Sequence, residues 1–443
     1  MEKRLSKTQT IALGFFVIIL IGTLLLMLPI STKSGESIGF HNALFTATSA
    51  TCVTGLIIAD TFRTWSYFGQ VIIITLIQIG GLGFITLGVF LTVFLRQRVG
   101  LRERNLVQES LNAMQLSGAV RLVKKAVAYT LLTEGIGAVV LTIRFIPEFG
   151  VIKGIWYGIF HSISAFCNAG FDLMGEKAPY SSLVNYYDDI TINITVMMLI
   201  IIGGIGFIVL DDVFKHKFHV KKYMLHTKIV LFLTCILILA GAVLFFLFER
   251  DNLLKDMSVK GQILSSLFAS VSPRTAGFNT LDTAKFTQAS MLLNVVLMFI
   301  GGSPGSTAGG IKTTTLMVLL LFAWSNLRNT RGMNIFHRSL PDDSIKKAST
   351  VFLINLFLAT SAVMALCAIQ PLPLADVMVE VFSAIGTVGM STGITRELLL
   401  PAKYILILLM YCGRIGSMSF ALSFMERMKV APVKFPKEQI TIG

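Results

Sequence analysis

Long apolar segments alternate with polar ones along the whole chain, and the same arrangement occurs four times. In each unit an apolar span is followed by a short semi-apolar segment and then by a second apolar span. A helix needs roughly 20 apolar residues to cross a bilayer. The first spans are predicted at 11–30, 126–146, 229–248 and 349–370, and the second spans at 68–95, 190–210, 288–325 and 402–425. The pattern predicts an all-α membrane protein.

The short segments between the paired spans have too few residues to cross a membrane. They are predicted at 39–51, 153–166, 260–272 and 374–386. Helices of this length fit re-entrant hairpins, whose non-helical backbone is tolerated at membrane depth only where it lines a cavity or is buried in protein. We therefore expect four tandem helix–pore helix–helix repeats, arranged pseudo-four-fold around one central ion pore.

Basic residues fall in alternate polar segments. These segments divide the chain into its repeats and indicate which of its loops face the cytoplasm. Most of the 38 Lys and Arg residues lie near 3–7, 96–125, 215–228, 328–347 and 427–437. Because positive loops stay in the cytoplasm, both termini and the three loops are predicted to be cytoplasmic. The predicted repeats are 1–100, 101–222, 223–340 with an intramembrane gate loop at 301–310, and 341–443 with a cytosolic tail.

Composition excludes most other classes of protein. Of the 443 residues 54% are hydrophobic and 14% are charged, whereas a soluble domain has about 25% charged residues. The net charge of +14 is explained by topology and contact with anionic lipids, so nucleic acid is not needed. The cysteines form no CxxC pair and no metal-ligand spacing, which indicates neither disulfides nor zinc; they are Cys52, Cys167, Cys235, Cys367 and Cys412.

A Ser-Ala-x4-Gly pattern follows the short helices and ends at Gly55, Gly170 and Gly389, while the third repeat reaches Gly277 one residue later. A potassium filter replaces hydration water with rings of backbone carbonyls, and glycine adopts the positive φ that turns successive carbonyls the same way. Short helices aimed at the centre would also place their negative ends near a cation. We expect the filter to bind K+ through backbone carbonyls only, at Val53, Thr54, Gly55, Asn168, Ala169, Gly170, Thr275, Ala276, Gly277, Thr387, Val388 and Gly389.

A second glycine pattern recurs in the returning spans, as Gly80-Gly81, Gly203-Gly204, Gly301-Gly302 and Gly413-Arg414. Tight helix packing is one explanation of these small residues. In the third repeat, however, the pattern opens into a stretch that no membrane helix would tolerate as regular backbone. The predicted gate consists of Gly301, Gly302, Ser303, Pro304, Gly305, Ser306, Thr307, Ala308, Gly309, Gly310 and Arg414.

Charged residues near the predicted pore leave alternatives open. Arg414 occupies a glycine position of the other repeats and is either an electrostatic barrier or a structural tie. Arg274 is expected to anchor the filter from behind, paired with a carboxylate or with carbonyls. Glu134 is either a structural partner or an ion site. The acidic residues after the filter loops either concentrate cations or cap helices; these are Asp60, Asp172 and Asp282.

An ion pore fits the sequence better than other functions do. A Na+-coupled secondary transporter with alternating access would predict inverted repeats and an intramembrane carboxylate relay, whereas these repeats share one orientation. The segment from Gly305 to Lys312 superficially resembles a Walker A motif, but Ile311 separates its glycine from the lysine and the segment lies in an apolar span. No catalytic constellation is present in the sequence, so an enzyme is not expected.

The four glycine loops, the sequence Arg274-Thr275-Ala276-Gly277-Phe278-Asn279 and the gate loop resemble the superfamily of Trk, Ktr and plant HKT potassium transporters. Length matches the KtrB membrane subunits of bacterial Ktr systems. The resemblance implies K+ uptake across the bacterial plasma membrane, a role in osmotic adaptation, and a homodimer with one pore per subunit. It also implies a cytosolic ring of KtrA-type RCK subunits that carries ATP or ADP, with no organic cofactor on this chain. Relatives with Ser in place of the first filter glycine favour Na+, so Gly55 implies potassium.

Overall fold

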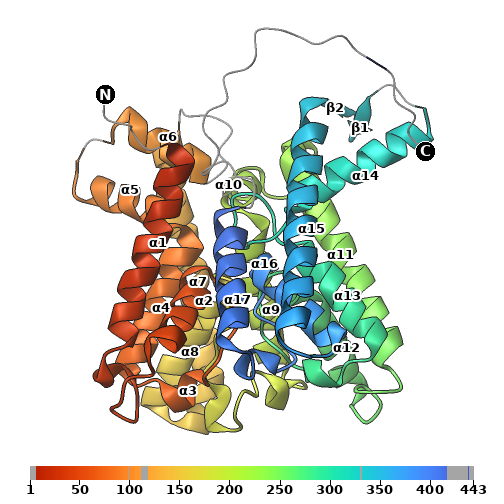
Figure 1. Ribbon diagram of the computed structural model, residues 1–443. Coiled ribbons are helices and arrows are strands. Elements are labelled where there is room, and N and C mark those ends of the chain that lie inside the picture. Colours follow the sequence, from red (N-terminus) through yellow and green to blue (C-terminus); the bar gives the residue numbers. More distant parts are fainter. Residues whose placement is uncertain (1–5, 98, 111–117, 330–331, 417–437, 439–443) are drawn as a thin grey trace.

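The computed structural model describes residues 6–97, 99–110, 118–329, 332–416 and 438 (Figure 1). In this part of the chain, four helices are long and apolar enough to cross a membrane. They are α1 (Lys7–Leu26), α7 (Ala119–Phe149), α11 (Leu225–Glu249) and α15 (Asp343–Ile369). These helices correspond to the four predicted first spans. The first begins at a capping box in which Ser6 Oγ accepts from Gln9 N, and Gln9 Oε1 from Ser6 N.

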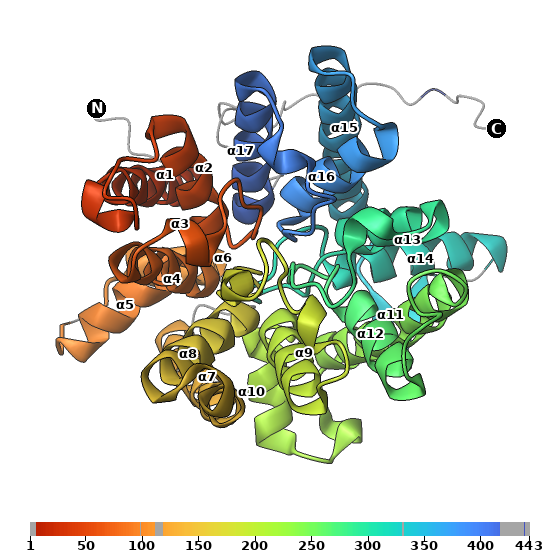
Figure 2. The ribbon, with the colours of Figure 1, turned by 90° about the horizontal axis from the view of Figure 1, so that it is seen from below.

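Four shorter helices follow the long ones and correspond to the predicted pore helices. They are α2 (Phe40–Thr51), α8 (Val151–Phe166), α12 (Val259–Val271) and α16 (Leu374–Gly386). Seen from below in Figure 2, the repeats surround the centre of the molecule in chain order. Each pore helix contains a fully buried or nearly fully buried apolar side chain, at Phe45, Phe160, Phe268 and Val379. The architecture is therefore the predicted set of four helix–pore helix–helix repeats.

Two of the predicted second spans are bent rather than continuous. The span 68–95 consists of α4 (Tyr67–Leu82) and α5 (Phe84–Phe94), which meet at an angle of 91°. The span 190–210 consists of α9 (Ile190–Ile205) and α10 (Phe207–His216), which meet at 101°. Gly83 and Gly206, with φ of 80° and 97°, occupy the corners. A positive φ ends an α-helix, and glycine adopts it without steric cost. The apolar run alone did not reveal these corners.

The other two second spans differ from each other. In the third repeat α13 (Gln288–Phe299) and α14 (Thr313–Leu327) are separated by a non-helical segment, 300–312, as the glycine-rich sequence predicts. In the fourth repeat α17 (Leu400–Ile415) ends at Gly416, which has a φ of 94°. The remainder of the predicted span, 417–425, and nearly all of the predicted cytosolic tail lie outside the described residues.

Short elements complete the chain. The remaining α-helices are α3 (Thr61–Thr64) and α6 (Leu101–Ser110). An antiparallel hairpin of β1 (Met333–Ile335) and β2 (Arg338–Leu340) is a small exception to the all-α prediction. The 3₁₀ turns are η1 (Pro29–Ser31), η2 (Met174–Glu176), η3 (Val184–Tyr186), η4 (Val220–Lys222), η5 (Thr283–Lys285) and η6 (Ile394–Arg396).

The two ends of the molecule differ in charge. The helices α5, α6 and α10 and the β-hairpin, which adjoin the basic segments, lie together at the top of Figure 1. The loops that follow the pore helices lead to the opposite end, where α3 lies. We call this opposite end the outer end. The basic segments at one end are those that the charge pattern predicts to be cytoplasmic.

Candidate ion filter and intramembrane loop

The four loops after the pore helices share two positions of positive φ. The glycines have positive φ values of 92°, 71°, 78° and 92°, at Gly55, Gly170, Gly277 and Gly389. The residues two positions earlier also have positive φ values, of 57°, 60°, 79° and 51°, at Val53, Asn168, Thr275 and Thr387. Positive φ is uncommon for a residue other than glycine. Its repetition at equivalent positions means that the four loops turn their carbonyl groups in the same way.

The four loops form a closed ring, because each filter glycine lies close to the backbone of the next loop. A Cβ added to any of these glycines would lie under 3.0 Å from the carbonyl oxygen of a residue in the next repeat. The pairs are Gly55 with Ala169, Gly170 with Ala276, Gly277 with Val388, and Gly389 with Thr54. The contacts run from repeat 1 to 2, 3, 4 and back to 1. All twelve predicted filter residues thus lie in one ring, in which repeats 2 and 4 are opposite each other.

A serine from the end of each pore helix supports its loop. In the first repeat Ser49 Oγ accepts a hydrogen bond from Gly55 N at 3.1 Å. In the fourth, Ser383 Oγ accepts from Gly389 N at 2.9 Å. These bonds hold the backbone amide away from the ring and so leave the carbonyls free to line it. The Ser of the repeated sequence pattern therefore has a defined structural role.

The equivalent serine of the third repeat is not the residue that the sequence pattern indicated. Ser164 Oγ in the second repeat donates to the Phe171 carbonyl at 2.7 Å, and Ser272 Oγ in the third donates to the Phe278 carbonyl at 2.5 Å. Ser270 instead donates to the carbonyl of Ile238 on α11 at 2.8 Å. The third loop is thus one residue shorter from serine to glycine, not one residue longer.

A cavity of about 140 Å³ lies at the outer side of the ring and is lined by the four filter glycines. Asp172 and Asp282 also line this cavity, which we call the outer vestibule. Asp60 does not, and its carboxylate accepts from Arg63 N and Tyr180 N, each at 2.8 Å. Asp60 and Asp282 both cap helices, since Asp282 is the N-cap of η5 (Thr283–Lys285) and accepts from Ala284 N at 3.2 Å. Asp172 and Asp282 lie where they can attract cations.

The segment 300–312 crosses beneath the ring and is bonded to the broken helix of the second repeat. Ser303 N donates to the Gly204 carbonyl at 2.9 Å, and Phe207 N donates to the Gly305 carbonyl at 2.9 Å. The Thr307 hydroxyl donates to the carbonyl at the end of α8 at 3.1 Å. The irregular backbone therefore satisfies its polar groups against other protein backbone, as membrane depth requires.

Arg414 joins this segment to the first repeat. Its guanidinium donates to the carbonyl oxygens of Thr307 and Gly80, and to that of Gly81 at 3.0 Å. The eleven predicted gate residues are thus brought together, with carbonyls rather than carboxylates as partners of the arginine. A guanidinium stays charged at this depth, so a positive charge lies beneath the ring.

Lys312 is a second cation at this place, and it belongs to the segment that superficially resembles a Walker A motif. Its Nζ donates to the carbonyl of Ala308 at 2.7 Å and to that of Gly309 at 3.3 Å. Lys312 and Arg414 both line a cavity of about 280 Å³ on the other side of the segment. A lysine inside an apolar span was the signal that could have revealed it.

Two further charged residues lie behind the ring. Arg274 is buried, and its hydrogen bond in the described structure goes to Thr234 Oγ1 at 3.4 Å, so the expected carboxylate or carbonyl partner is not found there. Glu134 Oε2 accepts from Gln78 Nε2 at 3.2 Å, and Cys167 Sγ lies 3.8 Å from Oε1. Glu134 therefore supports the second repeat from behind, which favours its structural alternative.

Comparisons with known proteins show which family and fold this chain shares. A family model described as TrkH, cation transport protein, matches residues 3–431. The potassium/sodium uptake protein NtpJ of Enterococcus hirae is 41% identical, over 100% of this chain and 98% of its own. Ktr system potassium uptake protein B of Bacillus subtilis is 40% identical, over 99% and 97% of the two chains. The crystal structure of the potassium transporter TrkH from Vibrio parahaemolyticus has the same fold, with a TM-score of 0.74 over 96% of this chain and 86% of that chain at 18% identity.

Proposed function

Since the chain belongs to the TrkH family of cation transport proteins and is therefore a transporter, not an enzyme, we propose that it is the ion-translocating membrane subunit of a potassium uptake system. The observation that carries the proposal is the closed ring of four glycine loops. Such a ring offers a cation successive carbonyl oxygens in place of hydration water. The printed functions of the 41% and 40% identical relatives, both potassium uptake proteins, support the same ion.

Permeation through this ring is channel-like. A cation enters from the outer vestibule, loses water, and is coordinated by the carbonyls of the residues just before each glycine. Asp172 and Asp282 at the vestibule raise the local concentration of cations. The pore helices point their negative ends toward the centre, which further stabilises a cation there. No side-chain carboxylate coordinates the ion in the ring itself.

The gate is the segment 301–310 together with Arg414. The segment crosses the path just inside the ring, and the guanidinium both ties it to the first repeat and opposes a passing cation electrostatically. Lys312 adds a second positive charge at the same depth. Opening requires the carbonyl contacts of Arg414 to break, so that the segment and the charge leave the path together.

The assembly extends beyond one chain. We propose that the protein is a homodimer in the bacterial inner membrane and that both of its termini are cytoplasmic. The proposed repeats of each chain are 1–100, 101–222, 223–340 and 341–443. A cytosolic KtrA-type RCK ring that binds ATP or ADP would control the gate from the basic end. The names of relatives from Bacillus subtilis and Vibrio alginolyticus as components of Ktr systems support such a partner, and the cluster of basic segments offers it a surface.

A Na+-coupled alternating-access transporter is the second candidate, because one relative is named a potassium/sodium uptake protein. Flux of ⁸⁶Rb+ into proteoliposomes separates the two. For a channel-like filter we expect uptake down the Rb+ gradient without any Na+ gradient, with K+ competing far better than Na+. An absolute requirement for a Na+ gradient would favour the alternative, and equal competition by Na+ and K+ would contradict a potassium filter. Adding the cytosolic ring with ATP or ADP tests its control of the same flux.

A further inference from the structure

A loop of the second repeat, residues 172–189, extends over the outer vestibule and contacts the other repeats. On the side of the first repeat, Arg63 Nε donates to the Gly175 carbonyl at 2.9 Å. On the side of the third, Asn279 N donates to Ser182 Oγ at 3.1 Å, and Leu183 N donates to the Asn279 carbonyl at 2.9 Å. The loop thus contacts both repeats that adjoin the second, and its residues Tyr180 and Ser182 line the vestibule.

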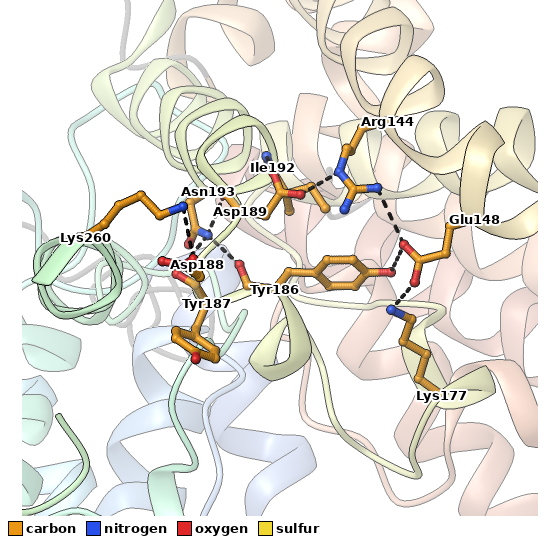
Figure 3. Close-up of polar contacts among 10 residues, drawn as sticks. All are labelled: Arg144, Glu148, Lys177, Tyr186, Tyr187, Asp188, Asp189, Ile192, Asn193 and Lys260. Atoms are coloured by element: carbon orange, nitrogen blue, oxygen red, sulfur yellow. Dashed lines mark hydrogen bonds and ion pairs between the residues drawn. The ribbon is translucent and has the colours of Figure 1, made fainter. Parts of the chain in front are cut away.

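Ion pairs fix the outer border of this loop, as Figure 3 shows. Two ion pairs tie the loop to α7, from Arg144 Nε to Asp189 Oδ2 at 2.5 Å and from Lys177 to Glu148. A third ties it to α12, from Lys260 Nζ to Asp188 Oδ2 at 3.0 Å. The hydrogen bond from Lys260 lowers the pKa of Asp188, so this carboxylate stays charged at neutral pH. Anchored at both borders, the loop has little freedom to move away from the mouth.

Tyr180 is held in an unusual conformation at the middle of the loop. Its φ is 56°, and that of Ser182 is 44°. Positive φ costs free energy for such residues and persists only where the surroundings enforce it. Here the hydrogen bond from Tyr180 N to Asp60 Oδ2, at 2.8 Å, is one of the contacts that enforce it. The strained backbone directs the phenol ring of Tyr180 into the lining of the vestibule.

Arg396 of the fourth repeat lies over that ring from the opposite side of the pore. Its guanidinium carbon is 4.1 Å from the centre of the Tyr180 ring, within the range of a cation–π contact. Its Nε donates to the Gly393 carbonyl at 3.3 Å. Repeats 2 and 4 are opposite in the ring of filter loops, so this contact bridges the mouth. Both side chains line the vestibule together with the filter glycines.

The charge of Arg396 is not neutralised by a neighbour. None of the ion pairs between described residues involves it, whereas Asp282 across the vestibule is paired with Lys285 at 3.3 Å. A fixed positive charge in a water-filled entrance lowers the local concentration of every cation. The factor of this decrease depends exponentially on the charge of the cation, so the factor for a divalent cation is the square of that for a monovalent one. The same cavity thus holds two aspartates, one of them paired with a lysine, and one arginine, which has no ion-pair partner among the described residues and repels cations.

We propose that Arg396, clamped on Tyr180 across the mouth, determines how readily potassium enters the filter. This inference rests on the proposed function. The arginine acts on entry and not on the gate, which lies on the other side of the ring. It should therefore affect the external concentration at which uptake is half-maximal, and leave the maximal rate unchanged.

The test measures the apparent KM for external Rb+ and the inhibition constant of external Ba²⁺ in Arg396→Gln. Removing one charge should lower the KM for Rb+ about two- to five-fold. Because Ba²⁺ carries two charges, its inhibition constant should fall by the square of the same factor. Arg396→Lys keeps the charge and should resemble the wild type. Tyr180→Leu, which releases the guanidinium, should shift both constants in the same direction as Arg396→Gln, and Tyr180→Phe should shift neither.

Lys255→Gln is the matched control, since Lys255 is an exposed lysine between α11 and α12 that does not line the vestibule. It should change neither constant. Unchanged constants in Arg396→Gln, or equal factors for Rb+ and Ba²⁺, would overturn the role of Arg396 while the potassium selectivity of the wild type still supports the proposed function. A wild type that does not distinguish K+ from Na+ would overturn both.

Discussion

At four positions in the ring, the absence of a side chain is what lets neighbouring loops touch. We expect Gly55→Ser and Gly389→Ser to reduce potassium uptake about tenfold and to erode discrimination against Na+. A Cβ at either position would meet a carbonyl of the adjacent loop, and a φ of 92° costs an L residue roughly 1–2 kcal/mol. Competition of Rb+ uptake by K+ and by Na+ measures both effects.

Gly88→Ser in α5 is the control for this substitution. Gly88 has no atom within 4 Å of an added Cβ and does not have a positive φ. It should leave uptake and selectivity unchanged. Wild-type K+/Na+ selectivity in well-expressed variants of both Gly55 and Gly389 would show that the filter lies elsewhere.

The positive φ of the four loop glycines could be predicted from sequence because conformational freedom is a property of the residue itself. The serine that supports the third loop could not. Ser270 and Ser272 each miss the spacing of the other repeats by one residue, and only the contact of Ser272 with the Phe278 carbonyl distinguishes them. The partners of Lys312 could not be predicted for a similar reason, since they are backbone carbonyls, and only the place of this lysine in an apolar span indicated that it has partners.

At the scale of whole elements, length and hydropathy predicted the four spanning helices and the four pore helices well. They did not predict the bends at Gly83 and Gly206, because a glycine in an apolar run is compatible with a straight helix and with a corner. The bend at Gly206 is fixed by a distant element, through the bond from Phe207 N to the Gly305 carbonyl at 2.9 Å. Such non-local contacts are absent from local sequence patterns.

The intramembrane segment and Arg414 should behave as one barrier. Deleting part of 303–309, or substituting Arg414→Ala, should raise potassium flux severalfold in the absence of the cytosolic partner. Combining them should give less than the sum of the two effects, because the guanidinium bonds the segment itself at the Thr307 carbonyl and contacting sites are not additive. Initial rates of Rb+ uptake by the wild type, the two single variants and the combined variant measure the coupling between the segment and Arg414.

Arg328→Ala controls for the loss of an arginine elsewhere. Arg328 lies at the end of α14, where it stacks on Trp324 with 4.3 Å between its guanidinium carbon and the ring centre. It should leave the flux unchanged. If the deletion and Arg414→Ala both fold and neither raises flux without the partner, the barrier lies elsewhere and Arg414 is a structural tie.

At the scale of the whole molecule, the repeats of the sequence predicted the four-fold architecture, but not the contacts that close it. Repeats show that four units are alike; they do not show that Gly389 meets Thr54 and so joins the last unit to the first. The opposition of repeats 2 and 4, and with it the contact between Arg396 and Tyr180, follows from that closure. Spatial order of this kind depends on tertiary packing.

That four loops of one chain form a single carbonyl filter is tested most directly by locating the ion. Crystals of the full chain grown with Rb+ give anomalous peaks wherever the ion binds. We predict peaks on the central axis, in contact with the carbonyl oxygens that adjoin the filter glycines, those of Thr54, Ala169, Ala276 and Val388. Rb+ bound at a side-chain carboxylate such as Glu134, with no peak between the four loops, would contradict it.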